Sequence, residues 1–293
     1  MNRMNPRLSL LFWLFAVTQA RAIDDISAGG FLWLQGYDLN PPTHGFRIDG
    51  QLRIESTDEP QPVGINLSSG EVTNSPAGVI YVNNGPGGAR FIAGDLWNDG
   101  LVTLNSVLLF DRDDAEVVNR GLFEAAPFSG AAVTGRRGIF RQVAGAVRFA
   151  DSSSRFEFYH GSRFIYEGGN VFGEPLLAGS TAVISPAVTT DVSLRFVGVG
   201  SVYDGAITAN RTVKLDFDFR FGVASLRLTN VSDLRGRIQL TAGLGDPSVA
   251  LTLPAEGLRV APEGIFRVNP STDRKSTRLN SSHGGISRMP SSA

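Results

Sequence analysis

The amino-acid sequence predicts an all-β protein built as a right-handed parallel β-helix. The motif Asn-x-Gly-Leu occurs at Asn98–Leu101 and again at Asn119–Leu122, and weaker glycine-containing echoes recur at gaps of about 21 to 24 residues. Several segments also alternate apolar and polar residues, as strands with one buried face do. A period of this length with short strands is typical of a solenoid, in which each coil buries its apolar face on the next.

Glycine and asparagine are expected at the corners of the coils because both tolerate a left-handed backbone better than other residues. A β-sandwich is the alternative fold, since it also contains short strands at spacings of about ten residues. The solenoid is favoured because the Asn-x-Gly motif recurs too far apart for hairpin turns alone. About 250 residues at about 22 residues per coil predict roughly eleven coils.

Residues 1–22 are predicted to be a signal peptide. Arg3 and Arg7 precede an unbroken apolar run, Leu8–Val17. The segment Ala20–Ala22 (Ala-Arg-Ala) then fits the small-x-small rule for signal-peptide cleavage. The apolar run is too short to span a bilayer, which needs about twenty residues. We therefore expect an exported chain that starts at Ile23, lies outside the cell or on the outer-membrane surface, and has no membrane span in its native part.

Residues 273–293 are predicted to be a translated sequencing adapter and not native protein. The stretch Asp273–His283 (DRKSTRLNSSH) reads back into the DNA of a common adapter, and Ser287–Ala293 (SRMPSSA) reads back into its next constant block. The native gene is then expected to be cut near Thr272. This segment is excluded from the fold prediction.

Charge and cysteine content narrow the classes of partner. The two terminal segments hold seven basic residues and one acidic residue, so the 27 basic and 28 acidic residues of the chain fall to 20 and 27 without them. This mild acidity favours neither nucleic acid nor an anionic membrane surface as a partner. The chain contains no cysteine, so packing and hydrogen bonds must stabilise the exported protein without disulfide bonds.

The remaining residues fall into three regions. Residues 23–45 are expected to cap the open end of the solenoid, residues 46–180 to form coils, and residues 181–272 to form further coils or a second β region. Val213–Phe221 (VKLDFDFRF) is the clearest predicted strand, with one valine, one leucine and three phenylalanines on its inner face. Arg155–His160 and Arg163–Gly169 follow the same pattern, so phenylalanine is expected to be the main core residue.

The segment GDLWNDGLVTL, followed by VVNRGLFEA, resembles the Asn-x-Gly coils of bacterial autotransporter and filamentous-haemagglutinin-like passenger domains. The resemblance covers about residues 70–171 and is poor over the rest of the chain. It implies a β-helix, and such passenger domains commonly act in adhesion.

The densest group of carboxylates is DRDDAE, which holds Asp111, Asp113, Asp114 and Glu116. Clustered oxygen ligands suit Ca²⁺, and acidic groups beside an arginine are similar to the calcium sites of β-helical polysaccharide lyases. The spacing is not that of an EF-hand loop, and a solvated loop between coils is the favoured interpretation. Calcium is therefore the single candidate cofactor, with these four residues as its candidate ligands.

Other candidate groups have simple structural interpretations. Asp216 and Asp218 lie two apart on one strand face, where they could act on a glycosidic bond. Neighbouring Lys214 and Arg220 favour a self-neutralising outer ladder instead. Trp33 and Trp97 could stack on a sugar, but a structural role is favoured for both.

No catalytic residue is predicted, because the sequence contains neither a Gly-x-Ser-x-Gly elbow nor a His-Glu-x-x-His motif. The leading function is a secreted or cell-surface, structural or adhesin-like protein that binds carbohydrate or another cell-surface ligand. The alternative is a secreted polysaccharide-active enzyme, a lyase or glycosidase, with residues 111–116 as its calcium or catalytic loop. A groove that unites this loop with an arginine and a second carboxylate from adjacent coils would favour the enzyme.

Overall fold

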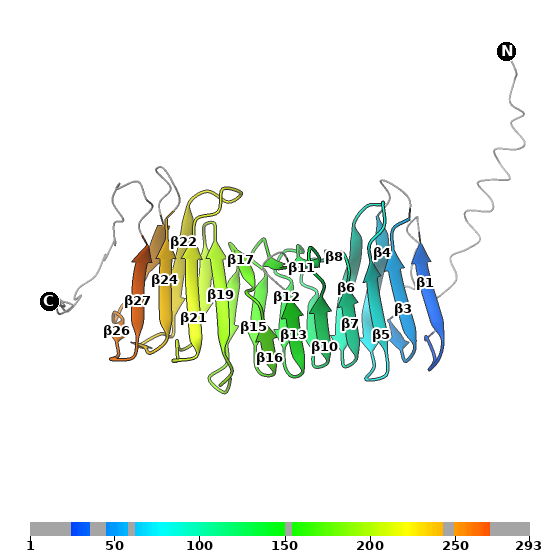
Figure 1. The fold of residues 1–293 in the computed structure, drawn as a ribbon, viewed down its shortest axis with the longest axis horizontal. Helices are drawn as coiled ribbons and strands as arrows, with labels where there is room; N and C mark the ends of the chain where they lie inside the picture. Colours follow the sequence, from blue (N-terminus) through cyan, green and yellow to red (C-terminus); the bar gives the residue numbers. More distant parts are fainter. Residues whose placement is uncertain (1–24, 36–44, 58–61, 150–153, 243–248, 270–293) are drawn as a thin grey trace, which may run out of the picture.

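The computed structural model describes residues 25–35, 45–57, 62–149, 154–242 and 249–269. These residues form a β-solenoid of about nine turns, built from parallel strands without any helix, so the predicted all-β solenoid is confirmed. The strands stack side by side along the long axis, from β1 at one end to β27 at the other (Figure 1). The predicted signal peptide and adapter tail lie outside the described residues.

Three ladders of paired strands run along the solenoid. The first ladder is the seven-stranded sheet, in which every pairing is parallel. Its strands are β1 (Phe31–Gln35), β3 (Gln51–Glu55), β5 (Val79–Asn83), β7 (Leu101–Leu104), β10 (Leu122–Ala125), β13 (Ala146–Phe149) and β16 (Asn170–Phe172). Beyond β16 this side of the solenoid carries turns and the short pair β23 (Asp233–Leu234) and β26 (Arg259–Val260).

The second and third ladders belong to one 18-stranded sheet, because β4 (Val63–Asn74) and β6 (Arg90–Asn98) pair in both. The second ladder continues through β2 (Phe46–Ile48), β9 (Glu116–Asn119), β12 (Ile139–Gln142), β15 (Arg163–Tyr166), β18 (Thr181–Ile184), β20 (Ser201–Asp204), β22 (Ala224–Thr229) and β25 (Val249–Thr252). The third ladder continues through β8 (Val107–Phe110), β11 (Gly130–Val133), β14 (Arg155–Phe158), β17 (Leu176–Ala178), β19 (Val192–Val197), β21 (Arg211–Asp216), β24 (Arg237–Thr241) and β27 (Ile265–Asn269).

The predicted number of about eleven coils was too high. That prediction assumed that every residue after the signal peptide belongs to a coil of about 22 residues. Excursions such as the hairpin at Asp218–Gly222 instead add residues that form no coil. The sequence repeats glycine at residues 168–171 and next at 204–207, a gap longer than one period. The structure fills this gap with a coil that lacks the motif, formed by β17 and β18. Strand β18 pairs with both β15 and β20, so the second ladder is continuous past residue 180.

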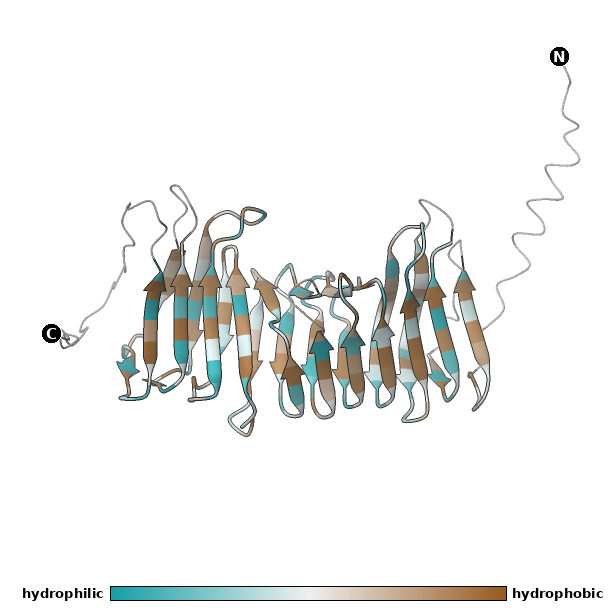
Figure 2. Ribbon diagram, viewed as in Figure 1, coloured by the Kyte–Doolittle hydropathy of each residue, from teal (hydrophilic) through white to brown (hydrophobic). Residues whose placement is uncertain are grey.

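The core lies inside the coils, where every second side chain of a strand is buried. Along β6, for example, Ile92 and Leu96 are fully buried, and Figure 2 shows hydrophobic and hydrophilic residues alternating along many strands. Phenylalanines from successive coils meet in the interior: the ring centroids of Phe123 and Phe140 are 5.6 Å apart, and those of Phe140 and Phe156 are 4.7 Å apart. The prediction that phenylalanine is a main core residue is confirmed.

A buried amide ladder explains the repeated asparagine. The Asn74 Nδ2 donates to Asn98 Oδ1 at 2.7 Å, and Asn98 Nδ2 donates to Asn119 Oδ1 at 2.6 Å. The ladder ends where Asn119 Nδ2 donates to Gln142 Oε1 at 2.7 Å. All four side chains are fully buried at the end of second-ladder strands. The asparagines therefore stack coil on coil, because an amide can both donate and accept, as Asn98 and Asn119 do here.

The expected left-handed backbone is absent from the two clearest corners. Asn98, Gly100, Asn119 and Gly121 do not have a positive φ. A Cβ atom on Gly100 would lie only 2.2 Å from the carbonyl oxygen of Ser75, so close approach of the previous coil explains this glycine. At these two corners the predicted physical reason was wrong. At the weaker corners it is confirmed, because Gly145, Gly169 and Gly205 have φ values of 63°, 77° and 135°.

The predicted strand Val213–Phe221 was too long. Strand β21 ends at Asp216, and the chain then turns back between Asp218 and Gly222. Phe219 is 85 % exposed and Asp218 only 8 % exposed, the reverse of the predicted alternation. The cause is local: Asp218 accepts hydrogen bonds from the backbone N–H and the guanidinium of Arg220, and such bonds compete with strand pairing.

Candidate functional site

The predicted acidic loop, residues 111–116, forms the corner between β8 and β9. Each acid contacts the next coil separately: the carboxylate of Asp111 accepts from the hydroxyl of Thr134 at 2.8 Å, and that of Asp113 accepts from the backbone N–H of Arg136 at 2.7 Å. The remaining two form ion pairs, Asp114 with Arg137 and Glu116 with Arg141, at 2.5 and 2.6 Å.

These contacts give the four carboxylates a structural role, the pairing of one coil with the next. In the part of the chain that the structure describes, no group of three or more Asp, Glu or His side chains could hold a metal ion. The loop also lines neither of the two hollows described below. The geometry of residues 111–116 thus lends no support to the calcium hypothesis or to a catalytic role.

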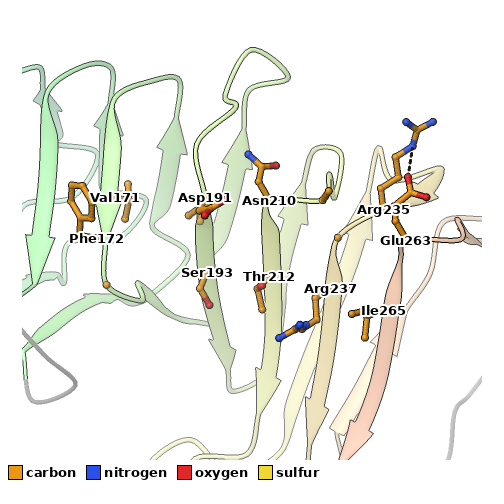
Figure 3. Close-up of a pocket in the computed structure, with 14 residues that line it drawn as sticks. Val171, Phe172, Asp191, Ser193, Asn210, Thr212, Arg235, Arg237, Glu263 and Ile265 are labelled. Atoms are coloured by element: carbon orange, nitrogen blue, oxygen red, sulfur yellow. Dashed lines mark ion pairs between the residues drawn. The ribbon is translucent and has the colours of Figure 1, made fainter.

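A hollow lies on the outer surface at the N-terminal ends of β19, β21, β24 and β27 in the third ladder, and we call it the polar groove (Figure 3). It has a volume of about 550 Å³. Its lining comprises Val171, Phe172, Gly173, Asp191, Val192, Ser193, Ala209, Asn210, Thr212, Arg235, Gly236, Arg237, Glu263 and Ile265. The strand register places Ser193, Thr212, Arg237 and Ile265 on four adjacent strands, so they form one row across the coils.

The groove lies beyond β16, where the first ladder has stopped and turns take the place of its strands. A buried arginine shapes that corner: the guanidinium of Arg211 donates to the carbonyl oxygens of Ser185, Val188 and Ala206 at 3.1, 2.9 and 2.5 Å. Arg211 is only 1 % exposed, so it fills the space that an apolar strand residue would otherwise fill. The neighbouring Asn210 donates to the carbonyl oxygen of Thr190 at 2.8 Å.

A second hollow lies beside the polar groove and shares Gly173 and Ser193 with it; we call it the charged hollow. It has a volume of about 510 Å³. Its lining comprises Phe149, Ser154, Arg155, Phe156, Glu157, Gly173, Glu174, Leu176, Ser193, Arg195, Lys214 and Arg220. Its charged side chains come from β14, β19, β21, the turn before β17, and the hairpin after β21.

Ion pairs organise the charged hollow. Arg220 donates to Asp218 at 2.9 Å and to Glu157 at 3.3 Å, so one guanidinium joins two carboxylates that are each only 8 % exposed. The hydroxyl of Tyr159 also donates to Glu157. Asp218 has a pKa below its ordinary value, mainly because Arg220 hydrogen-bonds to it, and the same bond raises the pKa of Arg220.

The other predicted aspartate is paired differently from the expectation. Asp216 pairs with Arg195 at 2.9 Å rather than with Lys214, which instead pairs with Glu174 at 2.6 Å. Both aspartates are neutralised, as predicted, but in different ways. Asp216 is neutralised across adjacent strands by Arg195, whereas Asp218 pairs with Arg220 within its own hairpin and not on the outer face of a strand. Sequence spacing could not show this, because Asp216 and Arg195 are 21 residues apart in the chain, Lys214 and Glu174 are 40 residues apart, and both pairs meet only through the stacking of the coils.

Both tryptophans lie on other faces of the solenoid. Trp33 is on the first ladder, where the guanidinium of Arg53 lies 4.8 Å from its ring centroid. Trp97 is on the second ladder, and Arg120 lies 5.1 Å from its ring. Each ring is therefore engaged by an arginine of the next coil.

In the ranges that the structure describes, no helical segment has the length and apolar character that a bilayer crossing requires. Comparison with known proteins found no matching family model, no similar curated protein and no similar solved structure.

Proposed function

We propose that this protein is an exported, surface-exposed, adhesin-like β-solenoid that binds an extended carbohydrate chain along its polar groove. The repeat resemblance to passenger domains and the N-terminal signal pattern support export and adhesion. The groove supports a ligand that runs across the coils. A secreted rod with such a groove would serve attachment without any chemical step.

The row Ser193, Thr212, Arg237 and Ile265 is the observation that carries this proposal. Parallel strands lie about 4.8 Å apart, so the row offers hydroxyl, hydroxyl, guanidinium and apolar groups at regular intervals. A polymer with repeating hydroxyl groups can engage such a row unit by unit. Phe172, 50 % exposed at one end of the groove, adds an aromatic surface on which a sugar ring can stack.

The test is a binding measurement with a blocked groove. The purified protein is titrated calorimetrically with oligosaccharides of increasing length, and affinity is expected to rise until the chain fills the groove. Thr212→Trp puts a bulky ring into the row and should weaken binding by about tenfold or more. Thr103→Trp is the matched control, because Thr103 occupies an outward position of β7 on the first ladder. Absence of oligosaccharide binding, or equal effects of both variants, would contradict the proposal.

The second candidate is a polysaccharide-active enzyme, and one observation favours it. Glu157 and Asp218 are two nearly buried carboxylates that contact the same guanidinium beside the groove. A pair of carboxylates is the usual requirement for glycoside hydrolysis. New reducing ends released from a bound polysaccharide, and lost in Glu157→Gln, would favour the enzyme over the adhesin.

A further inference from the structure

The charged hollow presents more positive than negative charge to solvent. Its lining holds four cationic side chains, Arg155, Arg195, Lys214 and Arg220, against two carboxylates, Glu157 and Glu174. Asp216 and Asp218 balance Arg195 and Arg220 but are not among the lining residues. These two ion pairs therefore direct their positive ends toward the hollow.

Both lining carboxylates are already neutralised. Glu157 accepts from the Tyr159 hydroxyl and from Arg220. Glu174 accepts from the Ser193 hydroxyl at 2.7 Å and pairs with Lys214 at 2.6 Å. Neither has much remaining capacity to satisfy another cation.

Arginine donors, by contrast, remain available. Within the described residues, Arg195 donates to Asp216 through its Nε, and no further side-chain bond of this guanidinium is present. The Arg155 side chain is 63 % exposed, and its nearest acid in the described residues is Glu157 at 4.0 Å. Two arginines with unused N–H groups, set in a concave site, suit the planar oxyanion of a carboxylate or sulfate.

We propose that the charged hollow binds the carboxylate or sulfate group of an acidic polysaccharide whose chain lies in the adjoining polar groove. This inference rests on the proposed function and adds its substrate class. The two hollows share Ser193, so one chain can reach both. The mild net acidity of the chain does not oppose this, because recognition rests on the unused N–H groups of Arg155 and Arg195 in the hollow, whereas distant charges are screened by salt.

The experiment compares three probes by calorimetry: an oligoglucuronate, a glucose oligomer of the same length, and inorganic sulfate at matched ionic strength. The oligoglucuronate should bind about tenfold or more tightly than the neutral oligomer, and its affinity should fall as salt is added. Arg155→Gln, a change at an exposed side chain, should remove most of that preference. Arg227→Gln, an exposed arginine on the second ladder, is the matched control and should leave it intact.

The outcomes separate the two proposals. Equal binding of acidic and neutral oligomers, unaffected by Arg155→Gln, would overturn the acidic ligand and leave groove binding standing. Sulfate binding as tight as that of the oligoglucuronate would also overturn it, because the site would then recognise a free oxyanion. Failure of both oligomers to bind would refute the proposed function itself.

Discussion

Removal of one amide from the buried ladder should destabilise the protein strongly. The side chain of Asn119 accepts from Asn98 at 2.6 Å and donates to Gln142 at 2.7 Å, and all three residues are fully buried. Asn119→Ala leaves the buried Oε1 of Gln142 without this donor, and it leaves Asn98 Nδ2 with only its 3.4 Å bond to the carbonyl oxygen of Leu122. A buried polar group that loses its partner costs about 1–3 kcal/mol, so the free energy of unfolding should fall by the cost of between one and two such groups, roughly 1–6 kcal/mol.

Urea unfolding followed by circular dichroism and by intrinsic fluorescence measures this loss. Coincident transitions by the two probes are needed, because a repetitive solenoid can unfold in parts. The matched control is Asn170→Ala, since Asn170 is an exposed asparagine at a neighbouring corner, and its change should stay within about 0.5 kcal/mol. The reasoning is refuted if Asn119→Ala is no more destabilising than this control, which would mean that water replaces the lost amide at little cost.

Three further predictions concern close packing and ionisation. Gly100→Asn should prevent stable folding, because a Cβ there meets the carbonyl oxygen of Ser75 at 2.2 Å. Gly161→Asn should be tolerated, since the positive φ of this residue suits asparagine and no atom outside the adjacent residues lies within 4 Å of the added Cβ. Thermal melting of the two variants tests both expectations. Asp218, whose pKa is depressed by Arg220, should contribute stability above its ordinary pKa of 3.8 that disappears as pH falls through the lower folded value. A melting curve of Asp218→Asn that keeps the full acid dependence of the parent would contradict this. Burial raises the pKa of Tyr203 from 10.0 to about 12, so its contribution should be complete below pH 10 and lost as pH rises toward 12. Tyr203→Phe should flatten alkaline unfolding over that interval, and an unchanged slope would exclude Tyr203 as its source.

Periodic features of the fold were readable from the sequence because each coil repeats the same local chemistry. The spacing of Asn98 and Asn119 located two corners, and alternation along Arg155–His160 located strand β14. The length of the strand after Val213 was not readable, because Asp218 forms a turn with Arg220 that outweighs the alternating pattern. The role of the corner asparagines was also missed, since an amide ladder requires knowledge of which residues stack.

Almost none of the residues that line the polar groove and the charged hollow could be predicted from the sequence. The acidic run at residues 111–116 attracted attention because its carboxylates are adjacent in the chain, yet each one pairs with a different residue of the next coil. The charged hollow collects Arg155, Arg195 and Arg220, which are far apart in the chain. The one available signal was Arg211 at the start of β21, where side chains alternate between core and solvent. A charged side chain in the core must be hydrogen-bonded or paired, so it marks an irregular corner.

The sequence by itself determined the β-solenoid, its approximate period and its phenylalanine-rich core, because these follow from local alternation and from a motif repeated once per coil. The tertiary structure alone decided which charges meet, where the first ladder ends and where the surface is hollowed. The physical reason is that side chains on neighbouring coils are separated by about twenty residues in the chain but by one strand spacing of about 4.8 Å in space.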